Sequence, residues 1–260
     1  MKVRNTGETQ RVLVTAGGSG IGRATAQAFL MSGAQVYICD ISQQALQETL
    51  KANPGMHGSV CDVGMPEQVE KMCREASSVM GGVSVLLNNA GIGGPRAAVE
   101  DINYAEWDKT LRVNLSGMFY CVKQVVPRMK EEGGGSIINI STSSVKTGLP
   151  NRLAYVASKA GVLGLSYNLA RELGPFKIRS NSILPGIIDN TRGRALVEAH
   201  ALENSQSVED STEQFLRYIS LRTFIQPEEI AGMAVFLTSK AARNISGQEI
   251  SVDGNAEWEM

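Results

Sequence analysis

Histidine is scarce in this sequence, with only His57 and His200 among 260 residues. A zinc site built on several histidines, or a serine hydrolase that needs a histidine as its base, therefore has few candidate residues. The four cysteines form no CxxC pair, which is typical of reduced proteins inside the cell. We therefore expect no metal site and a cytoplasmic protein.

An excess of charge is also missing, because 25 lysines and arginines stand against 26 aspartates and glutamates. A chain without a basic field is not expected to bind nucleic acid. Charged or small residues interrupt every apolar run before the ~18 residues that a membrane-spanning helix needs. The N-terminal MKVRNTGETQR lacks the apolar stretch of a secretory signal. We expect neither a nucleic acid nor a membrane as partner.

Aromatic residues make up only 5% of the chain, whereas glycine is frequent, with 27 residues. Short apolar runs alternate with longer helical patterns along the chain. Strands are predicted at 11–15, 35–39, 59–61, 84–88, 136–140, 178–184 and 249–252. Helices are predicted from about 21 to 33 and at 43–51, 66–79, 104–130, 154–173 and 227–239. This alternation predicts one α/β domain over residues 1–260, with a doubly wound parallel sheet of about seven strands and helices on both faces.

One segment interrupts the alternation. No strand pattern appears from residue 187 to about 227, and charged and polar residues are frequent there. Because a structureless insert of that length is unusual inside a compact domain, we expect it to contain helices. We predict that residues 187–223 form a lid over the substrate.

Glycines gather between the first predicted strand and the first helix, in Thr15-Ala16-Gly17-Gly18-Ser19-Gly20-Ile21-Gly22. Glycine lets the backbone turn tightly and approach a pyrophosphate, and the N-terminus of the next helix offers free N–H groups. A glycine-rich turn alone is weak support, since turns use glycine anyway. Its place between strand and helix predicts a dinucleotide site formed by Gly17, Ser19, Gly20, Ile21 and Gly22.

Asp40 ends the second predicted strand, about 20 residues after the glycines. A carboxylate there can accept hydrogen bonds from both adenosine ribose hydroxyls and would repel a 2′-phosphate. No arginine or lysine stands at Ser19 or Ile41 to bind such a phosphate. We therefore predict NAD rather than NADP as cofactor, with Asp40 and Ile41 at its adenosine. The alternative is that Asp40 is a solvated acid in a turn.

Four more motifs follow in order, namely Asn88-Asn89-Ala90-Gly91, Tyr155-Val156-Ala157-Ser158-Lys159, Pro185-Gly186 and Val252-Asp253-Gly254. With the glycine turn, they resemble the TGxxxGxG, NNAG and YxxxK motifs of the short-chain dehydrogenase/reductase family, in its single-domain branch with a Rossmann fold. The resemblance extends over roughly residues 9–256. It implies an NAD(P)-dependent oxidoreductase that acts on a CH–OH group, and it implies a homotetramer.

Tyr155 and Lys159 are four residues apart in a predicted helix, so they share one face of it. A phenol keeps its proton at neutral pH, and a neighbouring ammonium favours the ionised form. Taken alone, such a pair is usually ordinary helix surface. The resemblance implies that Tyr155 is the general acid/base, and that Lys159 promotes its ionisation and hydrogen-bonds the nicotinamide ribose.

The hydroxyl that orients the substrate is less clearly marked. The family has a serine thirteen positions before the tyrosine, and here that position is Thr142. Threonine can donate the same hydrogen bond, although a one-residue bulge would bring Ser143 into place instead. Asn114 matches the asparagine that holds a water for proton relay toward Lys159. The alternative for Asn114 is a buried amide that satisfies backbone groups.

The resemblance implies further cofactor contacts. They are Asp62 and Val63 at the adenine, Asn89, Ala90 and Gly91 beyond the fourth strand, and Pro185, Gly186 and Ile188 toward the nicotinamide. Three residues depart from the family pattern. Ala16 replaces the usual first glycine, which costs little if the backbone there is not left-handed. Asn190 stands where threonine is frequent, which leaves its contact with the cofactor open, and Asn255 replaces a common glycine with no evident consequence.

Basic side chains occur in the segments expected at the substrate mouth. Of these, Arg96, Arg152 and Arg192 could clamp a carboxylate, phosphate or sulfonate. The hypothesis is a small, polar secondary alcohol or its ketone, with an anionic group as one option. The alternative, that these arginines are solvated surface charges, is supported at least as well by the sequence.

Three other functions stay open. An epimerase or lyase on this scaffold would retain its NAD and release no NADH. A carbonyl reductase of 3-oxoacyl thioesters would more often use NADPH, which Asp40 disfavours. A non-catalytic NAD-sensing subunit would have no reason to keep Asn114, Tyr155 and Lys159 together.

Overall fold

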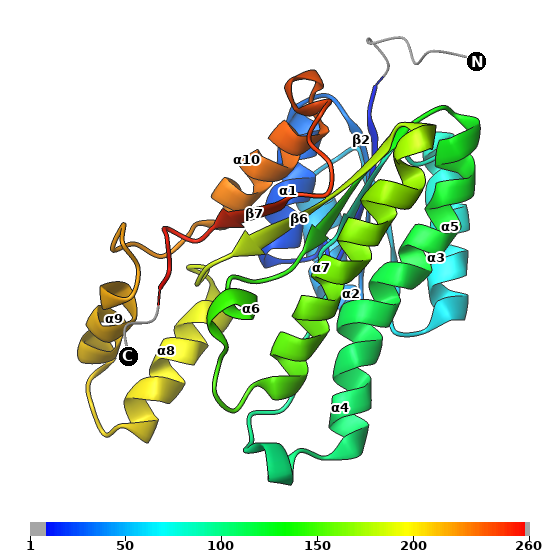
Figure 1. Cartoon of the computed structure of the whole chain (residues 1–260). Coiled ribbons are helices and arrows are strands. Elements are labelled where there is room, and N and C mark those ends of the chain that lie inside the picture. Colours follow the sequence, from blue (N-terminus) through cyan, green and yellow to red (C-terminus); the bar gives the residue numbers. More distant parts are fainter. Residues whose placement is uncertain (1–8, 258–260) are drawn as a thin grey trace.

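The apolar runs of the sequence form the strands of a seven-stranded parallel sheet in the computed structural model, which describes residues 9–257 (Figure 1). The strand order is β3-β2-β1-β4-β5-β6-β7, and every pair of neighbours is parallel. The strands are β1 (Arg11–Thr15), β2 (Gln35–Asp40), β3 (Met56–Val60), β4 (Val85–Asn88), β5 (Gly135–Ile140), β6 (Ile178–Pro185) and β7 (Glu249–Val252). The predicted fold class, a doubly wound α/β sheet, is confirmed.

Helices cover both faces of this sheet (Figure 1). They are α1 (Gly20–Met31), α2 (Gln43–Ala52), α3 (Pro66–Met80), α4 (Tyr104–Leu111), α5 (Gly117–Glu131), α6 (Ser144–Thr147), α7 (Leu153–Leu173), α8 (Thr191–Glu203), α9 (Val208–Arg217) and α10 (Pro227–Thr238). Successive strand residues point to opposite faces. Leu13 and Leu86 therefore pack with side chains of α3 and α5, whereas Val12 and Leu87 pack with side chains of α1 and α10. Burial of these two apolar clusters holds the layers together.

The predicted elements match the structure closely, apart from small shifts at their ends, the unpredicted short helix α6 and two larger differences. The third strand was expected at 59–61 but spans Met56–Val60, because this edge strand is polar and only partly buried. The long helix expected at 104–130 is divided by a π-helical turn, Arg112–Ser116, between α4 and α5. Such turns bulge one residue out of the regular helix and are frequent at functional sites.

The strand order reverses beside β1, which lies between β2 and β4. In open parallel sheets, ligands bind at the carboxyl ends of the strands next to such a reversal. The glycine turn follows β1, Asp40 ends β2, and Asn89 follows β4. The fold thus places residues far apart in sequence along one edge.

The predicted lid consists of α8 and α9, which project beyond this edge (Figure 1). A short parallel bridge between Ile188 and Ile225 closes the base of the segment. The Nδ1 atom of His200 on α8 lies 2.8 Å from the Ser211 hydroxyl on α9, which joins the two helices. The 187–223 segment is therefore an ordered helical pair anchored at both ends.

The described residues leave out 1–8 and 258–260. The N-terminal segment without a signal pattern and the two ends of the predicted 1–260 domain fall partly there. Within residues 9–257, no helix combines the length and apolar character needed to cross a bilayer.

Candidate active site

A cavity of about 620 Å³ lies between the glycine turn and the lid. Two sets of predicted residues line it. The predicted cofactor contacts are Ser19, Gly20, Ile21, Asn89, Gly91, Pro185, Gly186 and Ile188, and the predicted catalytic residues are Thr142, Ser143, Tyr155 and Lys159. The other predicted cofactor and catalytic residues do not line it. Gly17, Gly22, Ala90 and Asn114 are buried. Asp40 ends β2 and Ile41 follows it, while Asp62 and Val63 follow β3. One continuous edge therefore holds nearly all of the predicted site.

The turn at one end of the cavity requires glycine. A Cβ atom added to Gly22 would lie 2.0 Å from the carbonyl oxygen of Ala16, and one added to Gly17 would lie 2.6 Å from Cβ of Ile38. Ser19 caps α1, and its exposed hydroxyl makes no capping hydrogen bond. This bare helix N-terminus, with a backbone that can be approached closely, fits the pyrophosphate of a dinucleotide.

Alanine in place of the usual glycine was expected to cost little if the backbone at Ala16 were not left-handed. The backbone there is left-handed, with φ of 51°. For a residue with a Cβ atom this conformation costs about 1–2 kcal/mol. The Asn89 amide donates to the carbonyl oxygens of Thr15, at 3.1 Å, and Ala16, at 3.2 Å. Asn89, just after the neighbouring strand β4, thus helps to hold the strained turn.

Asp40 is fixed in place by backbone amides. Its two carboxylate oxygens accept hydrogen bonds from the N–H of Gly18, at 3.0 Å, and from the N–H of Ser42, at 2.9 Å. Each oxygen retains a lone pair, so the carboxylate can accept two further bonds. The adjacent Ile41 is exposed. This arrangement fits a pair of ribose hydroxyls at the outer end of the crevice.

The remaining adenosine-end residues are shaped by local hydrogen bonds. Asp62 accepts a bond from the N–H of Gly64 at 2.8 Å, while Val63 is buried. The Thr15 hydroxyl accepts bonds from the N–H groups of Asn89, at 2.9 Å, and Ala90, at 3.0 Å. These contacts tie the end of β1 to the loop after β4, across the point where the strand order reverses.

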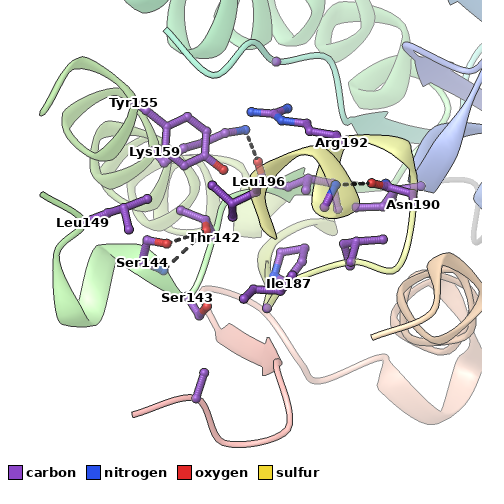
Figure 2. A pocket seen from close by; sticks show the side chains of 18 of the residues that line it. Thr142, Ser143, Ser144, Leu149, Tyr155, Lys159, Ile187, Asn190, Arg192 and Leu196 are labelled. Carbon is purple, nitrogen blue, oxygen red and sulfur yellow. Dashed lines mark hydrogen bonds between the residues drawn. The ribbon is translucent and has the colours of Figure 1, made fainter. Parts of the chain in front are cut away.

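Tyr155 and Lys159 lie together on α7 at the other end of the cavity (Figure 2). The Lys159 ammonium donates a hydrogen bond to the carbonyl oxygen of Ile140 at 2.7 Å. Burial, together with the nearby charge of Arg192, lowers the pKa of Lys159 to about 7. The charge of this buried amine therefore depends on its burial and on the nearby Arg192.

The hydroxyl groups after β5 separate into different roles. Ser141 donates a hydrogen bond to the carbonyl oxygen of Lys159 at 2.9 Å and so holds α7 to the sheet. The Thr142 side chain lies between Tyr155 and Ser144, whereas the Ser143 side chain points away from Tyr155 (Figure 2). The Thr142 hydroxyl is 3.3 Å from that of Ser144. This geometry favours Thr142 over Ser143 as the group that faces a substrate.

Asn114 lies in the π-helical turn and is completely buried. Its amide exchanges hydrogen bonds of 2.7 and 2.9 Å with the backbone of Ile92 and donates to the Ser158 hydroxyl at 3.0 Å. A Cβ atom on Gly91 would lie 3.3 Å from Oδ1 of Asn114 and 3.2 Å from Nζ of Lys159. Asn114 therefore positions the loop after β4 beside the Lys159 amine.

The three arginines predicted at the substrate mouth all line the cavity. Arg152 and Arg192 lie over the Tyr155 ring, with guanidinium carbons 5.5 and 5.7 Å from its centre. Arg96 forms an ion pair of 2.7 Å with Glu203 at the end of α8. Arg96 thus closes the lid against the loop after β4, while the other two arginines face the candidate catalytic tyrosine.

The departures from the family pattern have structural roles. Asn190 caps α8, where its Oδ1 accepts a hydrogen bond from the N–H of Gly193 at 2.9 Å. Asn255 has φ of 59°, a left-handed conformation that asparagine tolerates. Its amide donates to the Ser220 hydroxyl at 2.9 Å. Asn255 therefore fastens the C-terminal segment to the lid, a consequence that the sequence does not reveal.

Some lining residues were not predicted. Leu196 of α8 reaches into the cavity near Tyr155 and Thr142, opposite Leu149 (Figure 2). Phe215, Tyr218 and Glu257 also line the cavity. None of these residues belongs to a sequence motif, so only the fold could identify them. Within the described residues, no three histidine, cysteine, aspartate or glutamate side chains gather in a way that could hold a metal ion.

Comparisons with known proteins agree with this geometry. The family model described as enoyl-(acyl carrier protein) reductase matches residues 15–255. A probable galactose dehydrogenase of Rhizobium meliloti (strain 1021) is 36% identical over 248 residues, which cover 94% of this chain and 93% of that protein. The crystal structure of actinorhodin polyketide ketoreductase with NADPH has a TM-score of 0.90 and 30% identity, and covers 95% of this chain and 96% of that one. The structure of NAD⁺-bound xylitol dehydrogenase has a TM-score of 0.88 and 28% identity, and covers 94% of this chain and 98% of that one.

Proposed function

Since the chain belongs to the short-chain dehydrogenase/reductase family, we propose that it is an NAD-dependent dehydrogenase of a small, polar secondary alcohol. The family places it among the NAD(P)-dependent oxidoreductases that act on alcohols and ketones. The observation that carries the finer proposal is the arrangement of one cavity. Its glycine-rich end fits a pyrophosphate, and its other end brings Tyr155, Thr142 and Lys159 together.

The chain's own residues divide the work of binding and proton transfer. Bound NAD supplies the hydride acceptor, C4 of the nicotinamide ring. Thr142 donates a hydrogen bond to the substrate oxygen and so orients the carbinol toward Tyr155. The phenolic oxygen of Tyr155 takes the hydroxyl proton during oxidation and returns it during reduction.

Lys159 and Asn114 act through their neighbours. The Lys159 ammonium lies near Tyr155 on α7 and favours the ionised phenol. It also offers its remaining protons to the nicotinamide ribose. Asn114 holds the loop after β4 against Lys159, so that Gly91 and the amine keep their spacing. A water held there could pass the proton from this buried amine to solvent.

The crevice residues bind the rest of the cofactor. Asp40 accepts the ribose hydroxyls, and Ser19 with the first N–H groups of α1 binds the pyrophosphate. The other contacts proposed are Gly17, Gly20, Ile21, Gly22, Ile41, Asp62, Val63, Asn89, Ala90, Gly91, Pro185, Gly186 and Ile188. The proposed preference for NAD over NADP rests on Asp40.

Replacing Asp40 with alanine should reduce the preference for NAD over NADP by about tenfold or more, because charged hydrogen bonds to the ribose and repulsion of the 2′-phosphate are both lost. Asp40 also holds the N–H groups of Gly18 and Ser42. Asp40→Asn is therefore the matched variant, since it keeps an acceptor for the turn but removes the charge. Isothermal titration with both dinucleotides measures the ratio. If both variants keep the wild-type selectivity, the NAD assignment is wrong.

A carbonyl reductase is the second candidate, because an NADPH-bound ketoreductase is among the similar structures. It shares every proton-transfer residue with the dehydrogenase and differs in direction and cofactor. Assays in both directions separate the two. NADPH-driven reduction of a 3-oxoacyl thioester that outpaces NAD-linked alcohol oxidation would favour the reductase.

We also propose a homotetramer in the cytoplasm. All four cysteines are buried free thiols, as expected in a reducing compartment. Phe119 of α5 and Tyr167 of α7 are about half exposed, and β7 is an edge strand of the sheet. Apolar side chains on these helices and an unpaired strand edge are suited to contacts between subunits.

Light scattering on a size-exclusion column should give four times the chain mass of 27.9 kDa. Tyr167→Glu places a charge on the exposed face of α7 and should shift the protein toward smaller species. Met31→Glu, at a still more exposed position on α1, is the control and should leave the mass unchanged. A monomeric wild-type protein would contradict the tetramer.

A further inference from the structure

Positive charge gathers at the substrate end of the cavity. Arg152 precedes α7 and is partly buried; its Nη2 donates a hydrogen bond to the carbonyl oxygen of Gly93 at 2.9 Å. Its Nε atom is buried and has no hydrogen-bond partner among the described residues. Arg192, in the first turn of α8, extends its guanidinium toward Tyr155 and Lys159 (Figure 2). The two arginines come from the two sides of the cavity, one fixed and one on the lid.

The two guanidinium groups converge. A Cβ atom added to Gly93 would lie 2.5 Å from Nη2 of Arg152 and 3.2 Å from Nη2 of Arg192. Their central carbons lie 5.5 and 5.7 Å from the centre of the same Tyr155 ring. Two guanidinium groups that approach one point can both donate hydrogen bonds to a single oxyanion.

Within residues 9–257, carboxylates are scarce around this charge. Among the described residues that line the cavity, the one carboxylate is that of Glu257, whose N–H donates a hydrogen bond to the carbonyl oxygen of Tyr218 at 2.8 Å. Burial, followed by the charge of Arg192, lowers the pKa of both Arg152 and Lys159. Arg152 is partly buried and Arg192 is exposed, and two like charges this close together repel each other unless an anion binds between them. Arg96 differs, because Glu203 neutralises it.

We propose that the substrate carries a small oxyanion group, a carboxylate, sulfonate or phosphate, which Arg152 and Arg192 hold while Tyr155 faces the carbinol. The inference rests on the proposed dehydrogenase function and specifies its substrate class. The anionic group must be close to the reacting carbon, because both guanidinium groups lie over the ring that carries the catalytic oxygen. A cavity of about 620 Å³ that also takes the nicotinamide leaves room for a short molecule.

Binding of unreactive anions tests the site without turnover. Malonate, propane-1-sulfonate and propyl phosphate are titrated into the NAD-loaded protein, with 1-propanol as the neutral probe. At least one anion should bind, and Arg152→Met and Arg192→Met should each weaken that binding about 10- to 100-fold. Arg194→Met is the matched control on α8, because Arg194 is paired with Asp189 outside the cavity; it should change nothing.

Three outcomes would overturn the anion site. One is that no anion binds the wild-type protein. Another is that Arg152→Met binds the anions as wild type does. The third is that Arg192→Met weakens NAD binding and leaves anion binding intact, which would assign Arg192 to the cofactor.

Turnover then separates this inference from the function beneath it. The substrates are 2-hydroxybutyrate, 3-hydroxybutyrate and 2-hydroxypropane-1-sulfonate, compared with neutral 2-butanol and 1,2-butanediol. Arg152→Met should lower kcat/KM for the anionic alcohols about 10- to 100-fold more than for the neutral ones. An equal loss on both classes would contradict the inference. Arginine-dependent anion binding without NADH formation from any alcohol would reject the dehydrogenase function while the anion site remains.

Discussion

Replacing Tyr155 with phenylalanine should lower kcat about 10²- to 10⁴-fold while the Kd for NAD stays within about twofold. The variant loses one oxygen atom, the group that exchanges the proton with the substrate hydroxyl. It keeps the aromatic ring over which Arg152 and Arg192 lie. The cavity should therefore keep its shape. Steady-state formation of NADH gives kcat, and isothermal titration gives the Kd.

Tyr104→Phe is the control for this substitution. Tyr104 is the most exposed of the large apolar side chains, on α4 and outside the cavity. Loss of its hydroxyl should leave kcat and the Kd for NAD at their wild-type values. Near-full activity in Tyr155→Phe would show that another group moves the proton, and the proposed mechanism would be wrong.

Replacing Lys159 with methionine should lower kcat at least about 10²-fold and yet raise the free energy of unfolding near neutral pH. Burial, with the charge of Arg192, lowers the pKa of Lys159 from 10.5 to about 7. Between these values the unfolded chain holds a proton that the folded chain has lost, so stability rises with pH through this window. Below about pH 7 both states are protonated, and the cost of burying the charge is present in full.

Methionine removes that cost and fills a similar volume. It also leaves the carbonyl oxygen of Ile140 without the Lys159 hydrogen bond. We expect a net gain in the free energy of unfolding of about 3 kcal/mol at about pH 6. The gain should shrink as the pH approaches the pKa of the free amine. Urea unfolding at several pH values measures it, with Lys51→Met on the exposed face of α2 as control. A gain that is independent of pH would mean that the buried charge does not cause it.

Much of the fold follows from local pattern. The strands at Arg11–Thr15 and Glu249–Val252 have the predicted bounds, and the helix at Leu153–Leu173 begins one residue early. Apolar spacing and glycine punctuation are strong signals in these segments. The polar strand Met56–Val60 carries a weak signal, because it lies at the edge of the sheet and buries little.

Other features depend on contacts between distant residues. The π-helical turn is fixed by Asn114, whose partners Ile92 and Ser158 lie 22 and 44 residues away. The left-handed backbone of Ala16 is supported by Asn89 from the loop after β4. No short window of sequence contains both members of any of these three pairs, so no local rule could predict them.

The candidate site shows the same division. Motif spacing predicts Tyr155 and Lys159, and the structure places them together. The sequence alone did not distinguish Arg152 and Arg192 from solvated arginines, because their relation depends on how the lid helix crosses the cavity. The same crossing brings Leu196 near Tyr155 and Thr142. Side chains on a lid are located by tertiary packing and not by their own segment.

Transfer of deuterium tests the central proposal most directly. The protein is incubated with NAD and secondary alcohols deuterated at the carbinol carbon, drawn from polyols, sugars, hydroxy acids and hydroxysulfonates, and the dinucleotide is examined by mass spectrometry and NMR. Our account predicts NADH with deuterium at C4 of the nicotinamide, formed by the wild-type protein and almost absent with Tyr155→Phe. NAD that binds but gains no deuterium from any alcohol, or deuterium transfer that is undiminished in Tyr155→Phe, would contradict it.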